Sequence, residues 1–178
     1  KKVEELLQPV KLTVAGQPVK LGCILCEDGW SDQYYLKPID IYQQHSPVDL
    51  FVNISCSPFT LGKNNKRNRV FSRQAGDTGV PLVYVNNVGI QNNGKTVYAF
   101  DGHSTVYNSR GQIINYCPAF SSKLKILDLD LEAGGRNRDP VSVPGDLGKG
   151  VIYQAITYGL GKFLSSTGIR KVIIGISG

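Results

Sequence analysis

The sequence predicts an α/β fold, and three observations support this prediction. Near-continuous apolar runs of strand length occur at residues 19–25, 49–55 and 80–88. Such runs are typical of strands in a sheet that is covered on both faces. A helical stretch over residues 62–77, ended by Gly79, separates the second run from the third. Short strand patterns then follow at residues 97–100, 104–107 and 112–117, so the alternation of helices and strands gives way to a β-meander.

The remaining segments complete this prediction in chain order. Residues 1–18 indicate a helix end, a strand and a hairpin turn at 15–18 that leads into the first apolar run. Residues 31–47 predict a loop and a short helix interrupted at Pro38. Asn93-Gly94 is a strong hairpin signal, and residues 108–111 join the last two short strands.

Residues 123–132 alternate between leucine and acidic side chains. This alternation predicts a strand with one solvent-facing row. The row Asp128, Asp130 and Glu132 could be taken for a metal site. With no His or Asn nearby these three like charges make a poor cage, so we expect no metal there.

Composition limits the class of protein. The chain has 178 residues, of which 41% are hydrophobic and 19% charged, which is enough for a globular core. No apolar run reaches the length of a membrane span, and the first residues lack a signal-peptide pattern. Four cysteines without a disulfide spacing fit a reducing compartment. We therefore expect a cytoplasmic protein with no membrane partner.

A basic run lies inside the predicted helix. Five cations fall within eleven residues, namely Lys63, Lys66, Arg67, Arg69 and Arg73. Such a run could follow nucleic-acid phosphates. It lacks the interleaved aromatic residues of a single-strand binder, with Phe71 as the one candidate. A solvated helix face is the favoured interpretation, and we expect no nucleic-acid partner.

Cys26 stands where the first apolar run stops and the polar sequence Glu27-Asp28-Gly29-Trp30 begins. A thiol at the junction of a strand and a sharp turn is held on rigid backbone, and the backbone N–H of Glu27 beside it could stabilise an oxyanion. These features predict a nucleophile. The two acidic residues that follow would disfavour a thiolate, so a cation or a base must come from elsewhere. We expect Cys23 to be a buried, small apolar residue.

Cys23 and Cys26 also form a C-x-x-C pair, which leaves zinc or dithiol chemistry as an alternative. On a strand the two side chains point to opposite faces. A structural zinc site would need a second ligand pair at similar spacing, whereas Cys56 and Cys117 are isolated. We therefore expect no metal at Cys26.

A second unit follows a break in the pattern. Residues 134–145 are rich in glycine, proline and arginine and form the best linker candidate. Asp146 is positioned to cap a helix that Gly168 ends. Residues 170–176 then predict a buried strand with Ser177-Gly178 at its tip.

These motifs together resemble a known family. The stretches that carry the resemblance are residues 26–30, 53–58, 84–89, 100–104 and 109–111. They resemble the nitrilase-type carbon-nitrogen hydrolases and, more narrowly, the glutaminase domain of glutamine-dependent NAD synthetases. The resemblance covers nearly the whole chain. It implies a four-layer αββα sandwich, here partial, followed by the first helix and strand of an α/β ATP-binding domain.

The resemblance also implies a division of the chain. Residues 1–133 would be the C-terminal half of the glutaminase domain, residues 134–145 a linker, and residues 146–178 the start of the synthetase domain. Ser177 and Gly178 would open the loop that binds ATP phosphates. The implied cofactors are ATP and Mg²⁺ for the synthetase part and none for the glutaminase part. Glutamine and nicotinic acid adenine dinucleotide are the implied substrates, and a homo-oligomer is expected.

The same resemblance assigns roles to individual residues. Cys26 would be the nucleophile, with the backbone N–H of Glu27 as oxyanion donor. Ser57 and Lys63 would hold the charged end of glutamine, although Lys63 stands where the family commonly has Arg. The family's general base Glu and oxyanion Lys lie upstream of the Cys, and none of the 25 residues before Cys26 matches their motifs. The chain alone is therefore expected to be inactive.

Several alternatives stay open at this point. Either His103, which falls where the family often has Gly, or His45 could pair with Cys26 as a base. The leading hypothesis is a synthetase in which a Cys26 thioester releases ammonia that amidates the dinucleotide. A stand-alone amidase acting on a small amide is the second. A non-catalytic basic module that binds nucleic acid is the third.

Overall fold

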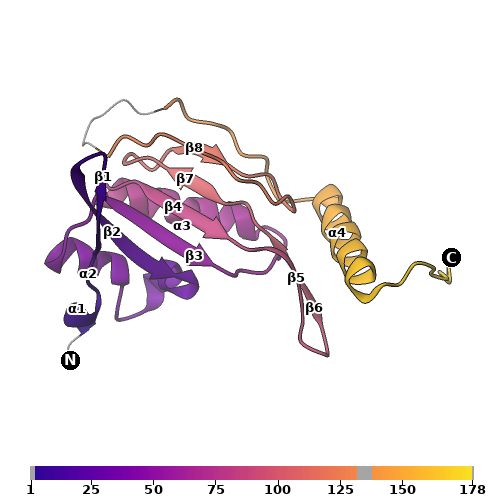
Figure 1. The fold of residues 1–178 in the computed structure, drawn as a ribbon. Coiled ribbons are helices and arrows are strands. Elements are labelled where there is room, and N and C mark those ends of the chain that lie inside the picture. The colour runs from indigo at the N-terminus through magenta and orange to yellow at the C-terminus, as the bar shows by residue number, and fades with distance from the viewer. Residues whose placement is uncertain (1–2, 132–137, 178) are drawn as a thin grey trace.

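The computed structural model describes residues 3–131 and 138–177, and within them the strands form a mixed six-stranded sheet and a separate hairpin (Figure 1). The sheet runs in the order β1 (Val10–Val14), β2 (Gln17–Leu25), β3 (Leu50–Ser55), β4 (Leu82–Asn86), β7 (Thr105–Tyr107) and β8 (Ile113–Tyr116). The hairpin consists of β5 (Val88–Asn92) and β6 (Val97–Asp101). β2, β3 and β4 are parallel, and the other pairs are antiparallel.

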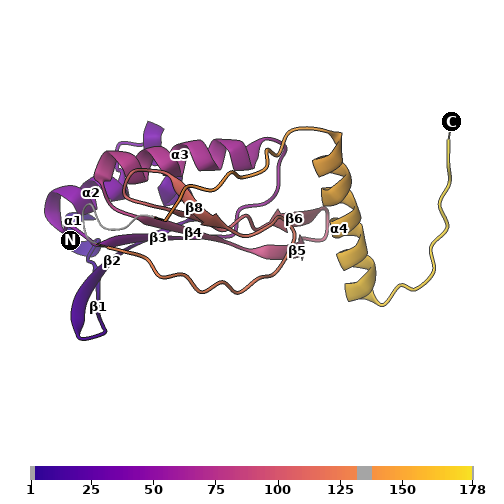
Figure 2. The ribbon, with the colours of Figure 1, turned by 90° about the horizontal axis from the view of Figure 1, so that it is seen from above.

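The helices lie mainly on one face of this sheet. They are α1 (Val3–Leu6), the 3₁₀ helix η1 (Cys26–Gln33), α2 (Pro38–His45), α3 (Lys63–Thr78) and α4 (Lys149–Thr167). Figure 2 shows α2 and α3 above the sheet, whereas α4 stands beyond the β5–β6 hairpin. None of the helices within the described ranges combines the length and apolar composition needed to cross a bilayer.

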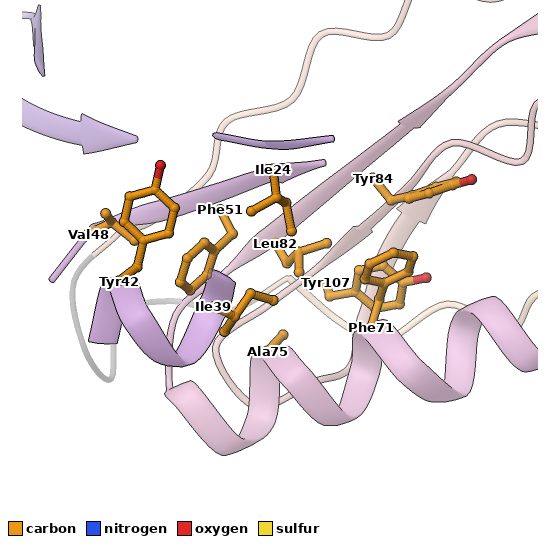
Figure 3. Packing of buried hydrophobic residues seen from close by; sticks show 10 residues of the cluster. All are labelled: Ile24, Ile39, Tyr42, Val48, Phe51, Phe71, Ala75, Leu82, Tyr84 and Tyr107. Atoms are coloured by element: carbon orange, nitrogen blue, oxygen red, sulfur yellow. The ribbon is translucent and has the colours of Figure 1, made fainter. Parts of the chain in front are cut away.

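The hydrophobic core fills the space between the sheet and helices α2 and α3 (Figure 3). The strands contribute Ile24, Phe51, Leu82, Tyr84 and Tyr107, and the helices contribute Ile39, Tyr42, Phe71 and Ala75. The Phe71 ring lies 4.9 Å from the Tyr84 ring, centre to centre. Full burial of one large apolar side chain contributes about 1.5–3 kcal/mol, so this cluster is what holds α3 on the sheet.

The predicted α/β fold is confirmed. The apolar side chains of Leu25, Ile54 and Val85 are exposed on the sheet face opposite the helices, so within the described residues the six-stranded sheet has a helix layer on one face. Cys23 is also exposed, contrary to the prediction. Strand alternation turns its neighbours Gly22 and Ile24 toward the helices, and it turns Cys23 toward the opposite face of the sheet.

Within the described residues, two predicted strands are not formed. Residues 123–131 are irregular, although Leu127, Leu129 and Leu131 are partly buried while Asp128 and Asp130 are exposed, as the alternation predicted. Residues 170–176 are irregular too, and Ile173 and Ile176 are more than 90% exposed. A strand needs a neighbour to receive its backbone hydrogen bonds, and within the described residues neither segment has one. Glu132, at the end of the first segment, lies outside the described residues.

Two helix predictions also need correction. Pro38 begins α2 rather than interrupting a helix, as suits a residue that lacks a backbone N–H. Arg67 is completely buried instead of lying on a solvated helix face.

Asp146 does not cap α4, which follows Gly148 without a side-chain cap. Instead, its carboxylate accepts hydrogen bonds from the backbone N–H groups of Asn64 and Asn65, at 2.7 and 3.2 Å. It therefore caps α3. The prediction failed because sequence proximity favoured the nearer helix.

Helix α4 packs on the β5–β6 hairpin through a small contact surface. Ala155 is buried there, and a Cβ added to Gly159 would meet Ala99 at 3.8 Å. The Tyr158 ring also lies 5.0 Å from the Phe120 ring. Gly168 ends α4 in the left-handed conformation, with φ at 71°, as predicted.

A buried ion pair connects α3 with β6. The Arg67 guanidinium donates to both carboxylate oxygens of Asp101, at 3.3 and 3.4 Å, and the two side chains are 0% and 3% exposed. The guanidinium also lies 4.9 Å from the centre of the Tyr84 ring. Breaking a buried pair leaves one charge without compensation, which costs more than the pair itself contributes.

We predict that Asp101→Ala lowers the free energy of unfolding by about 3–5 kcal/mol, because Arg67 would stay buried without its counter-charge. Urea denaturation measures the change. The matched control is Asp32→Ala, which removes the partner of Arg73 from an ion pair about half exposed on both sides and should cost at most about 1 kcal/mol. Equal losses in the two variants would contradict this role for the buried pair.

Candidate active site

The site forms at the carboxyl edge of the three parallel strands. Leu25 of β2 pairs with Ile54 of β3, and Ser55 of β3 pairs with Asn86 of β4. The residues that follow these strands therefore meet at one edge. In α/β sheets the carboxyl ends of the strands are where ligands bind.

Cys26 leaves strand β2 with a strained backbone. Its φ is 38°, in the left-handed region, where a residue with a Cβ pays about 1–2 kcal/mol. The side-chain amide of Asn53 donates to the Cys26 carbonyl at 3.5 Å and helps to hold this turn. Strained residues of this kind cluster at active sites because the surrounding structure fixes them there.

The acidic side chains after Cys26 are engaged by other groups. Asp28 accepts a hydrogen bond from the Leu25 backbone N–H at 2.9 Å. Glu27 accepts one from the Tyr34 hydroxyl at 2.5 Å, and this bond raises the pKa of Tyr34. The backbone N–H of Glu27 stands in the first turn of η1, where N–H groups have no partner within the helix. Its role as oxyanion donor stays a prediction.

Gly29 allows η1 to lie directly on α3. A Cβ at this position would come within 2.6 Å of the Phe71 ring and 2.9 Å of the Asn53 amide nitrogen. The Gly29 carbonyl accepts a hydrogen bond from the Gln74 side chain at 2.8 Å. Because any larger residue would push η1 away, Gly29 fixes the distance between Cys26 and helix α3.

A cavity of about 630 Å³ opens beside Cys26. Its lining includes all four residues that the sequence assigned to the glutaminase reaction: Cys26, Glu27, Ser57 and Lys63. Trp30, Cys56 and Lys66 also line it. The structure thus brings a thiol, a strained turn and two cations into one space of substrate size.

The side chain of Asn86 holds the backbone of Ser57. The Asn86 side chain accepts from the Ser57 backbone N–H at 2.8 Å and donates to the Ser57 carbonyl at 3.1 Å. It also donates to Asp101 at 3.4 Å. The position of Ser57 therefore depends on the buried ion pair between Arg67 and Asp101.

Lys63 is the first residue of α3 and reaches into the cavity. Its ammonium donates to the Pro58 carbonyl at 3.2 Å. Burial, and then the neighbouring Arg67, lowers the pKa of Lys63, while Asp101, Cys26 and Glu27 act in the opposite direction. A bound carboxylate would favour the charged ammonium in the same way. Lys66, one turn further on, lies 5.5 Å from the centre of the Trp30 ring.

Other candidates lie outside this cavity. Neither His45, exposed at the end of α2, nor His103 lines it. Of the residues upstream of Cys26, Glu5, Lys11 and Lys20 are exposed and do not line it either. Ser177 ends the irregular C-terminal segment, and Gly178, like Lys1 and Lys2, lies outside the described residues. Within the described ranges no group of three or more His, Cys, Asp and Glu side chains could hold a metal ion.

Five residues support the site in a way that was not predicted from the sequence. These are Asn53, Arg67, Asn86, Asp101 and Asp146. Asn53 and Asn86 each interrupt or end an apolar strand, and this polar residue in an apolar run is a signal that could have been used. The pairing of Arg67 with Asp101 carries no such local signal.

Comparisons with known proteins agree with this geometry. Residues 2–139 match the family model described as carbon-nitrogen hydrolase. A glutamine-dependent NAD(+) synthetase from Synechocystis is 36% identical over 168 residues, covering 90% of this chain and 29% of that protein. The enzyme of the same name from Thermotoga maritima is 29% identical and covers 90% of this chain and 32% of its own length. The chain thus spans less than a third of these curated relatives.

Solved structures give the same picture. The structure of a glutamine-dependent NAD+ synthetase from Acinetobacter baumannii in complex with ADP matches 93% of this chain and 29% of its own, with a TM-score of 0.76 and 28% identity. A carbon-nitrogen hydrolase from Helicobacter pylori matches 63% of this chain and 39% of its own, with a TM-score of 0.52 and 20% identity. The second match supports the fold alone. These matches confirm the resemblance drawn from the sequence.

His103 is buried outside the cavity and has a left-handed backbone conformation. Its φ is 52° and its side chain is buried, and among the described residues Nδ1 has no hydrogen-bond partner. Burial lowers the pKa of His103 below its ordinary value of 6.5; Asp101 and Asp146 oppose this shift, and Arg67 adds to it. The unfolded chain therefore binds this proton more readily than the folded chain does.

We predict that the free energy of unfolding falls as pH is lowered through and below 6.5, by at most about 1.4 kcal/mol for each pH unit from this group. Above pH 6.5 His103 is neutral in both the folded and the unfolded chain, so the stability that its burial as a neutral group allows is fully retained. His103→Asn, which tolerates the left-handed backbone, should weaken the pH dependence. The control His45→Asn alters an exposed histidine and should leave it unchanged. Urea titrations at several pH values test this, and identical curves for wild type and His103→Asn would contradict it.

Proposed function

Because the chain belongs to the carbon-nitrogen hydrolase family, we propose that Cys26 is the nucleophile of an amide hydrolysis and that the amide is the side chain of glutamine. The lining of one cavity by Cys26, Glu27, Ser57 and Lys63 supports this proposal. The thiol supplies the nucleophile, a backbone N–H the oxyanion site, and a cation the means to hold a carboxylate.

The reaction proceeds through a thioester. The Cys26 thiolate attacks the amide carbonyl carbon, and the oxygen takes the negative charge beside the N–H of Glu27. The carbon–nitrogen bond then breaks, the nitrogen takes a proton, and ammonia leaves. Water attacks the thioester, releasing glutamate and regenerating the thiol. The proton transfers need a base. The carboxylates of Asp28 and Glu27 already accept hydrogen bonds from the Leu25 N–H and the Tyr34 hydroxyl, so neither carboxylate is free to serve as that base.

Glutamine lies with its charged end toward α3. Lys63 provides a positive charge for the carboxylate, and Ser57, which lines the same cavity, provides a hydroxyl on a backbone that Asn86 holds. A lysine ammonium grips a carboxylate as a point charge, without the two-pronged geometry of arginine. Lys66 places a second cation on this side of the cavity.

We further propose that the ammonia serves a synthetase. The observation that carries this step is the extent of the likeness: the Acinetobacter synthetase matches 93% of the chain, beyond the residues 2–139 of the carbon-nitrogen hydrolase model. A stand-alone amidase has no need of a further helix such as α4. Residues 1–133 are then the second half of a glutaminase domain, residues 134–145 a linker, and residues 146–178 the start of the synthetase domain.

The second substrate in this proposal is nicotinic acid adenine dinucleotide, which the synthetase part amidates to NAD with ATP. ATP-dependent chemistry is supported by the likeness to a synthetase whose structure holds ADP. Ser177 is the one described residue of the expected phosphate loop and does not form a phosphate site by itself, so no step involving ATP or Mg²⁺ is assigned to it. Homo-oligomeric assembly and a cytoplasmic location are further parts of this proposal.

The nucleic-acid alternative is not favoured by the placement of the basic run. Arg67 is buried against Asp101, and Arg73 pairs with Asp32. Lys63 and Lys66 line the cavity beside Cys26. These cations serve separate local contacts rather than one continuous surface for phosphates.

We predict that a diazoketone analogue of glutamine labels Cys26, and not Cys23, Cys56 or Cys117, in the natural polypeptide that carries this chain. Only Cys26 combines the cavity with the strained turn at a strand end. Mass mapping of the labelled peptides measures the distribution, and an excess of glutamine should protect Cys26. Cys56 lines the same cavity, so a Cys56→Ser variant is the matched control and should keep its label. Labelling mainly on Cys23 or Cys56 would overturn the assignment.

We also predict that Lys63→Ala and Ser57→Ala weaken the use of glutamine while leaving synthesis from free ammonium nearly intact. Loss of a charged hydrogen bond to a ligand carboxylate costs on the order of 2 kcal/mol, or roughly thirtyfold in apparent affinity. Steady-state rates of NAD formation with each nitrogen source measure this. Arg69→Ala, an exposed change on the same helix, should behave like wild type. An unchanged glutamine dependence in both variants would mean that these residues are structural.

A further inference from the structure

The first turn of α3 lacks the groups that usually stabilise the start of a helix. Its N-cap residue is Gly62, which offers no side-chain cap, and no acidic residue stands in its first turn. The helix begins with the cation Lys63, and Lys66 and Arg67 follow. Positive charges are unfavourable at a helix N-terminus, because they meet the positive end of the helix dipole.

Asp146 supplies the missing group from a distant part of the chain. Its carboxylate accepts from the N–H of Asn64 at 2.7 Å, across 82 positions of sequence, and from that of Asn65 at 3.2 Å. The residue is 2% exposed. A buried carboxylate that accepts backbone N–H groups at a helix N-terminus both caps the helix and offsets its dipole.

The backbone beside this carboxylate is docked as well. The Gly62 N–H donates to the Asp146 carbonyl at 3.3 Å. The side chain of Leu147 lies against Gly62, where an added Cβ would meet it at 3.2 Å. Two consecutive residues ahead of α4 therefore hold the residues that begin α3.

Both groups proposed to hold glutamine depend on this contact. Lys63 lies between Gly62 and Asn64, the residues that Asp146 holds. The Asn64 side chain accepts from Arg67 at 3.1 Å, and Arg67 pairs with Asp101. Since Asp101 also binds the Asn86 side chain that holds Ser57, a continuous set of hydrogen bonds runs from Asp146 to Ser57.

We propose that Asp146 is a positioning residue for the glutamine site, acting on Lys63 through the start of α3 and on Ser57 through Asn64 and the buried ion pair. This inference rests on the function proposed above. Asp146 stands three residues before Lys149, the first residue of α4.

The test is Asp146→Asn in the natural polypeptide, with NAD formation measured from glutamine and from ammonium. We expect the KM for glutamine to rise about threefold to tenfold, because the neutral Asn amide loses the charge that offsets the helix dipole and has one oxygen for the two N–H groups that the carboxylate accepts. The kcat with either nitrogen source should stay within about twofold, because an interaction equal in ground and transition states changes KM alone. A merely structural role would instead lower both rates with the folded fraction and leave KM unchanged.

Asp139→Asn is the matched control, since it removes the same charge from an exposed position nearby; it should leave the KM for glutamine unchanged. If Asp146→Asn does not fold, Asp146→Glu keeps the charge but moves the carboxylate by one methylene, and the same rise in KM is expected. A KM equal to that of the Asp139→Asn control would overturn the inference. The proposed function fails separately, if the wild-type polypeptide neither uses glutamine nor is labelled at Cys26.

Discussion

The buried pair of Arg67 and Asp101 is the interaction on which the site depends most. It joins α3 to β6, and the side chains of Asn64 and Asn86 each add a hydrogen bond to it. Buried charges are expensive unless both partners are present and well hydrogen-bonded. This requirement fixes α3 over the carboxyl ends of β3 and β4. The helix can then present Lys63 to the cavity while the strands present Ser57 to it.

The nucleophile is held by different means. Cys26 takes a left-handed backbone conformation immediately after β2, and the 3₁₀ turn that follows is pressed against Phe71 through Gly29. The cost of this strained turn is offset by the packing of η1 on α3 and by the hydrogen bonds to Asp28 and Asn53. Thiol and cation are thus carried by separate elements that share one core, so the distance between them is set by packing and not by a flexible loop.

Much of the fold could be predicted, because the apolar runs and the turn signals are local. The strands that lead to Cys26, Ser57 and Asn86, the hairpin at Asn93-Gly94 and the end of α4 at Gly168 all follow from short-range patterns. Residues 170–176 show the limit of such patterns, since an apolar run forms a strand only when a neighbour pairs with it. Cys23 shows another limit of local patterns. The alternation of a strand predicts which side chains share a face of the sheet, but it does not predict which face the helices cover.

The site was predictable where a family motif marks it and unpredictable where tertiary contacts make it. Cys26, Glu27, Ser57 and Lys63 come from motifs and line one cavity. The supporting contacts of Arg67 and Asp146 join residues 34 and 82 positions apart. Arg67 in a basic run suggests a solvated face, and Asp146 before a helix suggests a local cap. In both cases a residue distant in sequence is the stronger electrostatic partner: Asp101 for Arg67, and the N–H groups that begin α3 for Asp146.

The central claim is that glutamine lies in the cavity with its amide at Cys26 and its carboxylate at the start of α3. The most direct measurement is a crystal structure of the natural polypeptide after covalent reaction with a diazoketone analogue of glutamine. The account predicts a bond to the Cys26 sulfur, the carbonyl oxygen facing the N–H of Glu27, and the carboxylate within hydrogen-bond reach of Lys63 and Ser57. An adduct on Cys26 whose carboxylate points away from α3, or an adduct on another cysteine, would contradict it.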